Sequence, residues 1–302
     1  MAEHTDRVYV LTGADSGIGA RTAELLRDRG ARVITCGISG RSDVRADIAE
    51  PAGRAALRAA VHERAPAGID GLALVAGIGA PSPATVRVNY FGTLAVLEGL
   101  RELLLRSSAP RAVAVSSASA LSHGDSALVR ACLRGDEQRA IARAARLARW
   151  GRGGTVYRST KIALNRWVRR HASGPSWAGS GVPLNVVAPG VVDTASARAS
   201  ILGDPVRTAV VAEALPQPLG FPGPVEAVAE AIAWTLNPAN AFTVGQIVHV
   251  DGGADAALRG DGPYRDGVRY GPAALVRMAR AAVAARTGRA TVTPTATPTA
   301  SR

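Results

Sequence analysis

A glycine-rich turn near the N-terminus restricts the fold of this chain more than any other feature. The segment Thr12-Gly13-Ala-Asp-Ser-Gly17-Ile-Gly19 lies between a short apolar run at residues 7–12, which predicts a strand, and helical spacing at residues 20–29. Glycine lets a backbone approach a phosphate closely, and the following helix N-terminus offers free N–H groups with partial positive charge. Ordinary tight turns also contain glycine, so its position between a strand and a helix is what favours nucleotide binding.

The same alternation of strands and helices continues along the chain. Apolar runs predict further strands at residues 31–36, 69–76, 112–117, 182–187 and 246–250. Helices are predicted at residues 51–64, 89–106, 157–172 and 225–236. This order is typical of the α/β class, and it predicts a single doubly wound Rossmann-type domain over residues 1–253, with a parallel sheet of about seven strands flanked by helices.

Three regions depart from the alternation. Residues 124–154 contain a stretch rich in Ala, Leu and Arg, which predicts a helical insertion. Residues 195–224 contain five prolines and are expected to form a loop over the substrate. Residues 254–302 form a C-terminal extension with a possible basic helix at residues 273–286 and a Thr/Pro/Ala tail, expected to be disordered from about residue 291.

Composition excludes several classes of protein. The longest apolar runs, such as residues 71–78, are much shorter than the ~20 residues of a membrane span. The first six residues lack the charged and apolar regions of a signal peptide, so a cytoplasmic location is expected. Cys36 and Cys132 form neither a disulfide framework nor a CxxC pair, and no metal site is predicted.

The net charge of +12 does not by itself indicate a polyanionic partner. The basic residues are scattered along helices, with no aromatic-interleaved patch, so neither a nucleic acid nor a membrane is expected as a partner. Arginine replaces lysine almost everywhere: of 36 basic residues, only Lys161 is lysine. This bias gives the one retained lysine more weight.

Lys161 lies four residues after Tyr157, so both side chains are expected on one face of a helix. A free tyrosine has a pKa of about 10 and is a poor base at neutral pH. A neighbouring cation favours the phenolate, and lowering the pKa by about three units requires ~4 kcal/mol. A surface Tyr/Lys pair would show the same spacing. Because this is the only lysine, the sequence favours Tyr157 as a catalytic acid/base with Lys161 lowering its pKa.

Two polar residues at element ends complete the candidate chemistry. The Ser117 hydroxyl, at the end of a strand, could bind a substrate oxygen, although a strand-end cap is an alternative role. The Asn89 amide could hold a water that relays protons toward Lys161, although Asn is also a frequent helix N-cap.

The end of the second predicted strand bears on cofactor choice. An acidic residue there would hold the ribose hydroxyls of NAD, but this sequence has Gly37. With no carboxylate to repel a 2′-phosphate, and with Arg41 or Ser39 able to contact one, NADP(H) is weakly favoured. Asp15 in the glycine turn argues slightly for NAD(H), and Arg41 could equally be a solvated loop residue.

In order along the chain, these residues resemble the short-chain dehydrogenase/reductase family in its classical form, over roughly residues 7–253. The resemblance implies an NAD(P)(H) cofactor and a catalytic set of Asn89, Ser117, Tyr157 and Lys161. The residues expected to bind the cofactor are Gly13, Ser16, Gly17, Ile18, Gly19, Gly37, Arg41, Asp47, Ile48, Ala76, Gly77, Tyr157, Lys161, Pro189, Gly190, Val192 and Thr194.

Within the family, residues 46–54, 71–79 and 88–92 and the helical insertion are most similar to the 3α-hydroxysteroid dehydrogenase/carbonyl reductase branch. Gly37 lacks the branch's usual acidic residue, and the tail after Gly253 is longer. The resemblance implies an oxidoreductase that interconverts a secondary alcohol and a ketone, with a hydroxysteroid-like or other apolar carbonyl compound as its small-molecule partner. It also implies a homo-oligomer, with a dimer formed by the helices at residues 89–106 and 157–172.

Two alternatives stay open. A non-catalytic dinucleotide-binding regulator would use the same fold, although it would have no need of all four catalytic side chains. The arginines of the C-terminal tail could instead contact a nucleic acid or a membrane surface.

Overall fold

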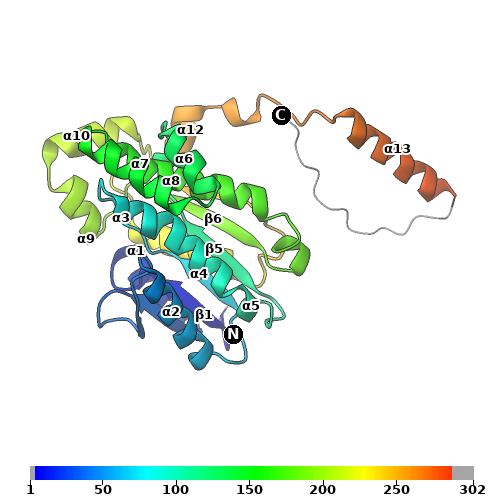
Figure 1. The fold of residues 1–302 in the computed structure, drawn as a ribbon, viewed down its shortest axis with the longest axis horizontal. Helices are drawn as coiled ribbons and strands as arrows, with labels where there is room; N and C mark the ends of the chain where they lie inside the picture. The colour runs from blue at the N-terminus through cyan, green and yellow to red at the C-terminus, as the bar shows by residue number, and fades with distance from the viewer. Residues whose placement is uncertain (1–3, 288–302) are drawn as a thin grey trace. The chain divides into compact units, whose positions relative to one another are not determined.

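Buried apolar runs form one parallel sheet. The computed structural model describes residues 4–287, and within this range seven strands pair in the order β3-β2-β1-β4-β5-β6-β7, all parallel (Figure 1). They are β1 (Val8–Thr12), β2 (Arg32–Gly37), β3 (Val44–Arg45), β4 (Gly71–Leu74), β5 (Arg111–Val115), β6 (Leu184–Pro189) and β7 (Ile247–Val250). The doubly wound α/β fold is confirmed, and β3 is a strand that the sequence analysis missed.

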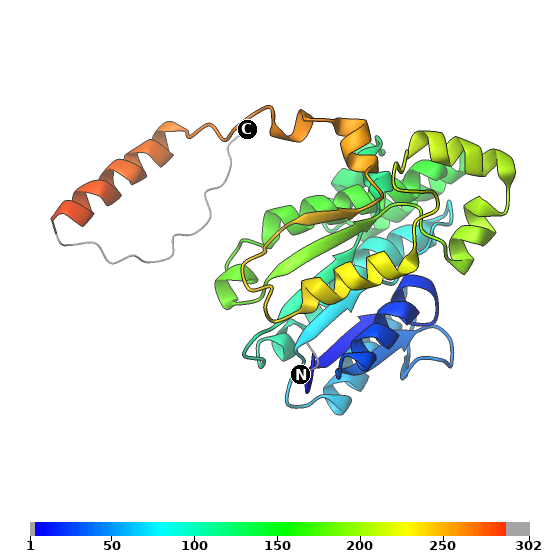
Figure 2. The ribbon, with the colours of Figure 1, turned by 180° about the vertical axis from the view of Figure 1, so that it is seen from behind.

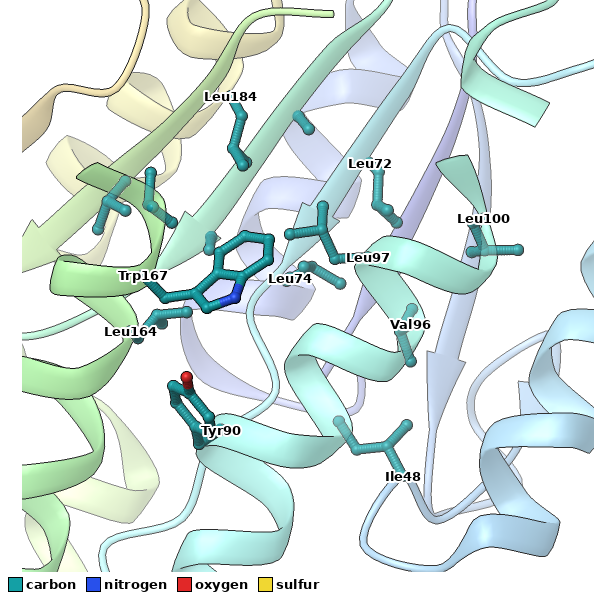
Figure 3. Close-up of a cluster of buried hydrophobic side chains, with 14 of the residues drawn as sticks. Ile48, Leu72, Leu74, Tyr90, Val96, Leu97, Leu100, Leu164, Trp167 and Leu184 are labelled. Carbon is teal, nitrogen blue, oxygen red and sulfur yellow. The ribbon is translucent and has the colours of Figure 1, made fainter. Parts of the chain in front are cut away.

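Helices cover both faces of the sheet. Figure 2 shows α1 (Gly17–Asp28) and α11 (Val225–Leu236) over one face. The other face carries α2 (Pro51–Arg64), α4 (Thr93–Gly99) and α8 (Gly154–His171), as Figure 1 shows. Figure 3 shows the core on this second face, where Trp167 and Leu97 pack with Leu72 and Leu74 of β4. Because helices bury both faces, the strands have continuous apolar runs.

The helix predicted at residues 89–106 is longer and is divided into four parts. It begins at α3 (Pro83–Val86), continues through the π-helical turn η1 (Arg87–Gly92) and α4, and ends with α5 (Arg101–Leu104). Proline suits the first turn of a helix, which explains the earlier start. π-Helical turns are rare and occur often at functional sites, and this one contains Asn89.

The predicted insertion consists of two helices, α6 (Ser126–Leu133) and α7 (Glu137–Arg149). They separate at Gly135, whose φ of +73° suits glycine. The Asp125 carboxylate caps α6 and forms an ion pair of 2.6 Å with Arg143 of α7. α6 packs on α8, and α7 packs on α3. The insertion therefore covers part of the surface that the resemblance assigns to a dimer interface.

The segment at residues 195–224, expected to be a loop, is largely helical. It contains α9 (Ala195–Ala197), the π-helical turn η4 (Arg198–Leu202) and α10 (Pro205–Ala214). Pro205 occupies the first turn of α10, where the missing N–H costs nothing, and Asp204 caps that helix. The loop prediction was wrong here because proline begins a helix as readily as it ends one.

The chain divides into the units Met1–Leu258 and Arg259–Arg302. The first contains the sheet, the short helical turns η2 (Ala118–Leu121) and η3 (Ala178–Ser180), and most of α12 (Ala254–Arg259). The second, taken by itself, contains η5 (Gly262–Tyr264) and α13 (Pro272–Arg286), close to the predicted basic helix. The tail expected to be disordered from about residue 291 lies outside the described residues. Over residues 4–287, no helix combines the length and apolarity needed to span a membrane.

Candidate active site

The carboxyl ends of four neighbouring strands meet at one edge of the sheet. The strand order reverses between β1 and β4, because β2 and β3 lie on one side and β5 to β7 on the other. Ligands of open α/β sheets bind at such a reversal point. The glycine turn follows β1, Gly77 follows β4, Ser117 follows β5 and Gly190 follows β6. The fold thus brings the predicted cofactor and catalytic segments to one edge.

The backbone of the glycine turn is tightly packed, but no side chain caps the N-terminus of α1. Gly13 and Gly17 have φ values of +73° and +55°. A Cβ on Gly13 would be 2.7 Å from the main chain of Ala76, and one on Gly19 would overlap the carbonyl oxygen of Gly13. Ser16 makes no side-chain cap, and the first turn of α1 has no acidic residue. The first N–H groups of α1 therefore fit the phosphates of a dinucleotide.

Asn89 lies fully buried in η1, and its side chain hydrogen-bonds to the chain that follows β4. Its Oδ1 accepts from the N–H of Ile78, and its Nδ2 donates to the carbonyl of the same residue, both at 2.9 Å. A Cβ on Gly77 would be 3.4 Å from Asn89 Oδ1 and 3.5 Å from Lys161 Nζ, so these side chains flank Gly77. The N-cap alternative for Asn89 was wrong, because the helix begins at Pro83.

Tyr157 and Lys161 lie in the first turns of α8, beside the end of β5. Lys161 Nζ is 5.7 Å from the centroid of the Tyr157 ring and donates to the carbonyl of Val115 at 2.8 Å. The Ser117 hydroxyl lies near the Tyr157 hydroxyl and acts to lower the pKa of the tyrosine. The Ser117 hydroxyl also accepts from the N–H of Ser119 at 3.1 Å, so it makes the predicted cap as well as the contact with tyrosine.

The ionisation of this pair differs from the expectation. Burial raises the pKa of Tyr157 above its ordinary value, and the nearby Ser117 hydroxyl acts in the opposite direction. Burial lowers the pKa of Lys161 to about 8. The expected lowering of the tyrosine pKa by Lys161 is therefore absent from the structure. The ammonium lies beside the ring and bonds to the Val115 carbonyl, and desolvation dominates at this buried site.

The expectation that no carboxylate is available at Gly37 was wrong. Asp15 reaches from the glycine turn to the end of β2, where its Oδ2 accepts from the N–H groups of Ile38 at 2.8 Å and Ser39 at 2.9 Å. Its Oδ1 accepts from the hydroxyl of Ser42 at 2.6 Å. A Cβ on Gly37 would overlap the Asp15 carboxylate. Residues 15 and 37 become neighbours only through the pairing of β1 with β2.

The remaining predicted contacts near the adenosine end differ in exposure. Arg41 and Asp47 are exposed, while Ile18 is half-buried against the α1 face of the core. Ile48 is only 5% exposed and belongs to the core in Figure 3. Its side chain therefore offers little surface to a ligand, which leaves Asp47 and the main chain for an adenine contact.

The segment Pro189-Gly190-Val191-Val192-Asp193-Thr194, which begins with the last residue of β6, lies against the glycine turn. Thr194 caps α9 by accepting from the N–H of Ala197 at 3.1 Å. A Cβ on Gly17 would be 3.3 Å from Thr194 Cγ2. Val192 forms an isolated parallel bridge with Gly223, which ties the segment to the chain before α11. Two segments that are both expected to bind the cofactor are thus adjacent.

Gln217 holds this segment and was missed by the sequence analysis. Its Oε1 accepts from the N–H of Val191 at 2.5 Å, and its Nε2 donates to the carbonyls of Val191 and Gly220 at 3.2 and 3.0 Å. A Cβ on Gly190 would overlap Gln217 Oε1. The side chain is buried. No local pattern indicates this role, because Gln217 lies among prolines and 26 residues from Val191.

Comparisons with known proteins agree with this geometry. A family model described as "Enoyl-(Acyl carrier protein) reductase" matches residues 13–255. The 3-alpha-hydroxysteroid dehydrogenase/carbonyl reductase of Comamonas testosteroni is 32% identical over 257 residues, which cover 83% of this chain and 98% of the relative. The cis-4-hydroxycyclohexanecarboxylate dehydrogenase of Sinomonas cyclohexanicum is 32% identical over 269 residues, covering 83% and 97%.

A solved structure supports the same assignment. The 3-alpha-hydroxysteroid dehydrogenase from Pseudomonas sp. B-0831, complexed with NADH, is similar with a TM-score of 0.77 and 41% identity, covering 83% of this chain and 98% of that one. The resemblance expected from the sequence, including the hydroxysteroid dehydrogenase branch, is confirmed. This chain belongs to the short-chain dehydrogenase/reductase family of oxidoreductases.

Proposed function

We propose that this protein interconverts a secondary alcohol and a ketone, with a nicotinamide dinucleotide as hydride carrier and Tyr157 as general acid/base. The observation that carries the proposal is the contact of Tyr157 with Ser117 beside Lys161, at the edge where the glycine turn opens. A non-catalytic regulator on the same fold would need only the glycine turn. The convergence of these three side chains therefore supports catalysis.

A bound nicotinamide supplies or accepts the hydride at the carbon that carries the oxygen. In the reducing direction, the Ser117 hydroxyl donates to the substrate oxygen and Tyr157 transfers its proton to that oxygen as negative charge develops there. Oxidation reverses these steps, with Tyr157 accepting the proton. Because burial raises the pKa of Tyr157 in the structure, this residue is well suited to hold a proton until the alkoxide forms.

Lys161 supplies the positive charge next to the tyrosine. With a pKa of about 8, it is mostly protonated at neutral pH. Its ammonium is fixed by the carbonyl of Val115 and flanks Gly77 together with Asn89. We assign Asn89 to positioning the chain after β4, since its amide is held by Ile78. A proton relay through a water at Asn89 stays a prediction.

The substrate proposed is an apolar ketone or its alcohol, such as a hydroxysteroid. Relatives that share nearly their whole length with this chain are named as dehydrogenases of hydroxysteroids and of a hydroxycyclohexane carboxylate. Residues 195–224 are proposed to cover the substrate, and their helix α10 exposes the apolar side chains of Val206 and Val210. Residues 1–253 would then form the catalytic domain of a cytoplasmic homo-oligomer, with residues 254–302 as an extension.

The proposed cofactor is NAD(H) or NADP(H). The similar hydroxysteroid dehydrogenase was solved with NADH, which supports dinucleotide binding here. The weak preference for NADP(H) expected from the sequence rested on the absence of a carboxylate beside Gly37. The position of Asp15 removes that reason.

The test is Tyr157→Phe, which removes the transferable proton and little else. Turnover of an alcohol or ketone panel with NADH and NADPH should fall by roughly 10²–10⁴-fold, while dinucleotide affinity measured by calorimetry changes less than about twofold. Tyr264→Phe is the matched control, because Tyr264 is 88% exposed in the C-terminal unit. Undiminished turnover in Tyr157→Phe would remove the tyrosine from the mechanism. Wild-type protein that binds dinucleotide but turns over nothing in the panel would favour the regulator.

A further inference from the structure

The carboxylates of Asp43 and Asp15 both accept hydrogen bonds from β2 or the loop that follows it, but they come from different segments. Asp43 accepts from the N–H and hydroxyl of Thr35 at 2.8 and 2.6 Å and lies 3.6 Å from Arg27 of α1. Asp15 instead comes from the glycine turn and binds the start of the loop at residues 38, 39 and 42. Only Asp15 lies in the segment that approaches the dinucleotide.

The Asp15 carboxylate is charged, and its partners are uncharged hydrogen-bond donors. Burial raises its pKa, but the hydrogen bonds it accepts from the loop together lower it below the ordinary range. Its Oδ2 accepts from the N–H groups of Ile38 and Ser39 and its Oδ1 from the hydroxyl of Ser42, and the Ser39 hydroxyl is a fourth partner. Over the residues that the structure describes, its partners are N–H and O–H groups rather than a cation. No cation among its described partners therefore balances its negative charge, and a ribose hydroxyl can replace a serine hydroxyl as its donor.

Gly37 is complementary to this carboxylate. Its φ is not in the left-handed region, so its conformation does not require glycine. What requires glycine is space, because a Cβ at this position would overlap both oxygens of Asp15. The carboxylate at the end of β2 therefore comes from position 15, and position 37 is kept small to admit it.

The end of the second strand is where doubly wound folds hold the adenosine ribose. Building on the dinucleotide site proposed above, we propose that Asp15 selects NAD(H) over NADP(H), by accepting from a ribose hydroxyl and repelling a 2′-phosphate across the space left by Gly37. A 2′-phosphate would bring about two negative charges next to the Asp15 carboxylate, and like charges in contact repel each other.

The experiment compares two ligands that differ only in the 2′-phosphate. Calorimetry compares ADP-ribose with 2′-phospho-ADP-ribose, neither of which contains nicotinamide, so catalysis does not enter the readout. Wild-type protein should bind ADP-ribose more tightly. Asp15→Asn removes the charge, and the ratio of the two affinities should shift toward the phosphorylated ligand by about tenfold to a hundredfold. Asp43→Asn is the matched control, because Asp43 holds the same loop but bonds to Thr35.

Moving the carboxylate tests the same idea in the opposite direction. Asp15→Ser should lose the preference, and Asp15→Ser combined with Gly37→Asp should restore it by returning an acid to the strand. Gly37→Ala should shift the ratio in the same direction as Asp15→Asn, because the added Cβ displaces the carboxylate. Circular dichroism and urea unfolding check that each variant is folded.

The outcomes separate this inference from the proposed function. If wild-type protein binds neither ligand, the dinucleotide site itself is wrong. If both bind and Asp15→Asn leaves their ratio unchanged, the site stands and the role of Asp15 is overturned. An equal shift in Asp43→Asn would also overturn it, since the effect would then come from the order of the loop. A shift confined to the Asp15 and Gly37 variants supports the inference.

Discussion

The two ends of the proposed dinucleotide site are built in different ways. At the reacting end, Tyr157 and Lys161 lie four residues apart on α8, and one helix sets their relation. At the adenosine end, Asp15 and Gly37 meet only because β1 pairs with β2, and the carboxylate bonds to a half-exposed loop. Two side chains on one helix are thus placed by local geometry. A carboxylate at the end of β2, in contrast, can come from β2 itself or from another segment that reaches the same position.

The largest effect should come from breaking the reacting end alone. Lys161→Met removes the only cation beside the Tyr157 ring in the described part of the chain, so turnover should fall at least about a hundredfold. Affinity for ADP should stay within about twofold, because ADP lacks both the second ribose and the nicotinamide. Arg166→Met, an exposed cation on the same helix, is the control. A comparable loss of ADP binding in Lys161→Met would mean that the two ends are not independent.

A second prediction concerns the pH dependence created by Lys161. Its pKa is about 8 in the folded protein against 10.5 ordinarily, so between these values the unfolded chain binds the proton that the folded chain has lost. The free energy of unfolding therefore rises with pH across this window, by roughly 1.4 kcal/mol per unit and about 3 kcal/mol in all. This contribution is complete above pH 10.5 and is lost as the pH falls through 8.

The measurement is urea unfolding of the wild type and Lys161→Met at several pH values, since their difference isolates this group. Lysine-selective ¹³C labelling gives one side-chain signal, because the chain has one lysine. Its titration midpoint should lie near 8. A midpoint above 10 would show that the ammonium is solvated and would contradict its placement in the buried site.

The smallest effect should come from Gln217, which holds residues 189–194 through Val191, as Asp15 holds the loop after β2. Gln217→Ala leaves the N–H and C=O of Val191 without their partner, which costs about 1–3 kcal/mol of unfolding free energy. Dinucleotide affinity should weaken severalfold while ADP-ribose affinity is retained. Gln217→Glu keeps the acceptor and loses the donors, so its free energy of unfolding should lie between those of Gln217→Ala and the wild type. Equal unfolding free energies for Gln217→Ala and the wild type would contradict this role.

Much of the fold could be predicted because its signals are local. The predicted ranges of α2 and α11 match the structure at both ends. In contrast, β3 has two residues and leaves no periodicity to detect. The helices of residues 195–224 were hidden because Pro205 was taken as a breaker, although it begins α10.

The residues of the site also differ in whether local sequence predicts their placement. The spacing of Tyr157 and Lys161 is visible in the sequence because it lies within one helix. The positions of Asp15 and Gln217 depend on contacts between segments 24 and 26 residues apart, which spacing does not reveal. The direction of the Tyr157 pKa shift could not be predicted from the sequence either. It depends on how deeply Tyr157 and Lys161 are buried beside the end of β5.

The solitary lysine has a practical consequence. Every other basic side chain in the count of 36 is an arginine, and Lys161 itself is 3% exposed. Arginine keeps its charge to above pH 12 and does not react with acylating reagents as amines do. A succinimidyl ester therefore meets no ε-amine on the protein's surface and can modify one only by reaching the buried Lys161, at the edge of the sheet that we propose as the active site. The rate at which this amine is acylated would thus report how often that edge opens to solvent.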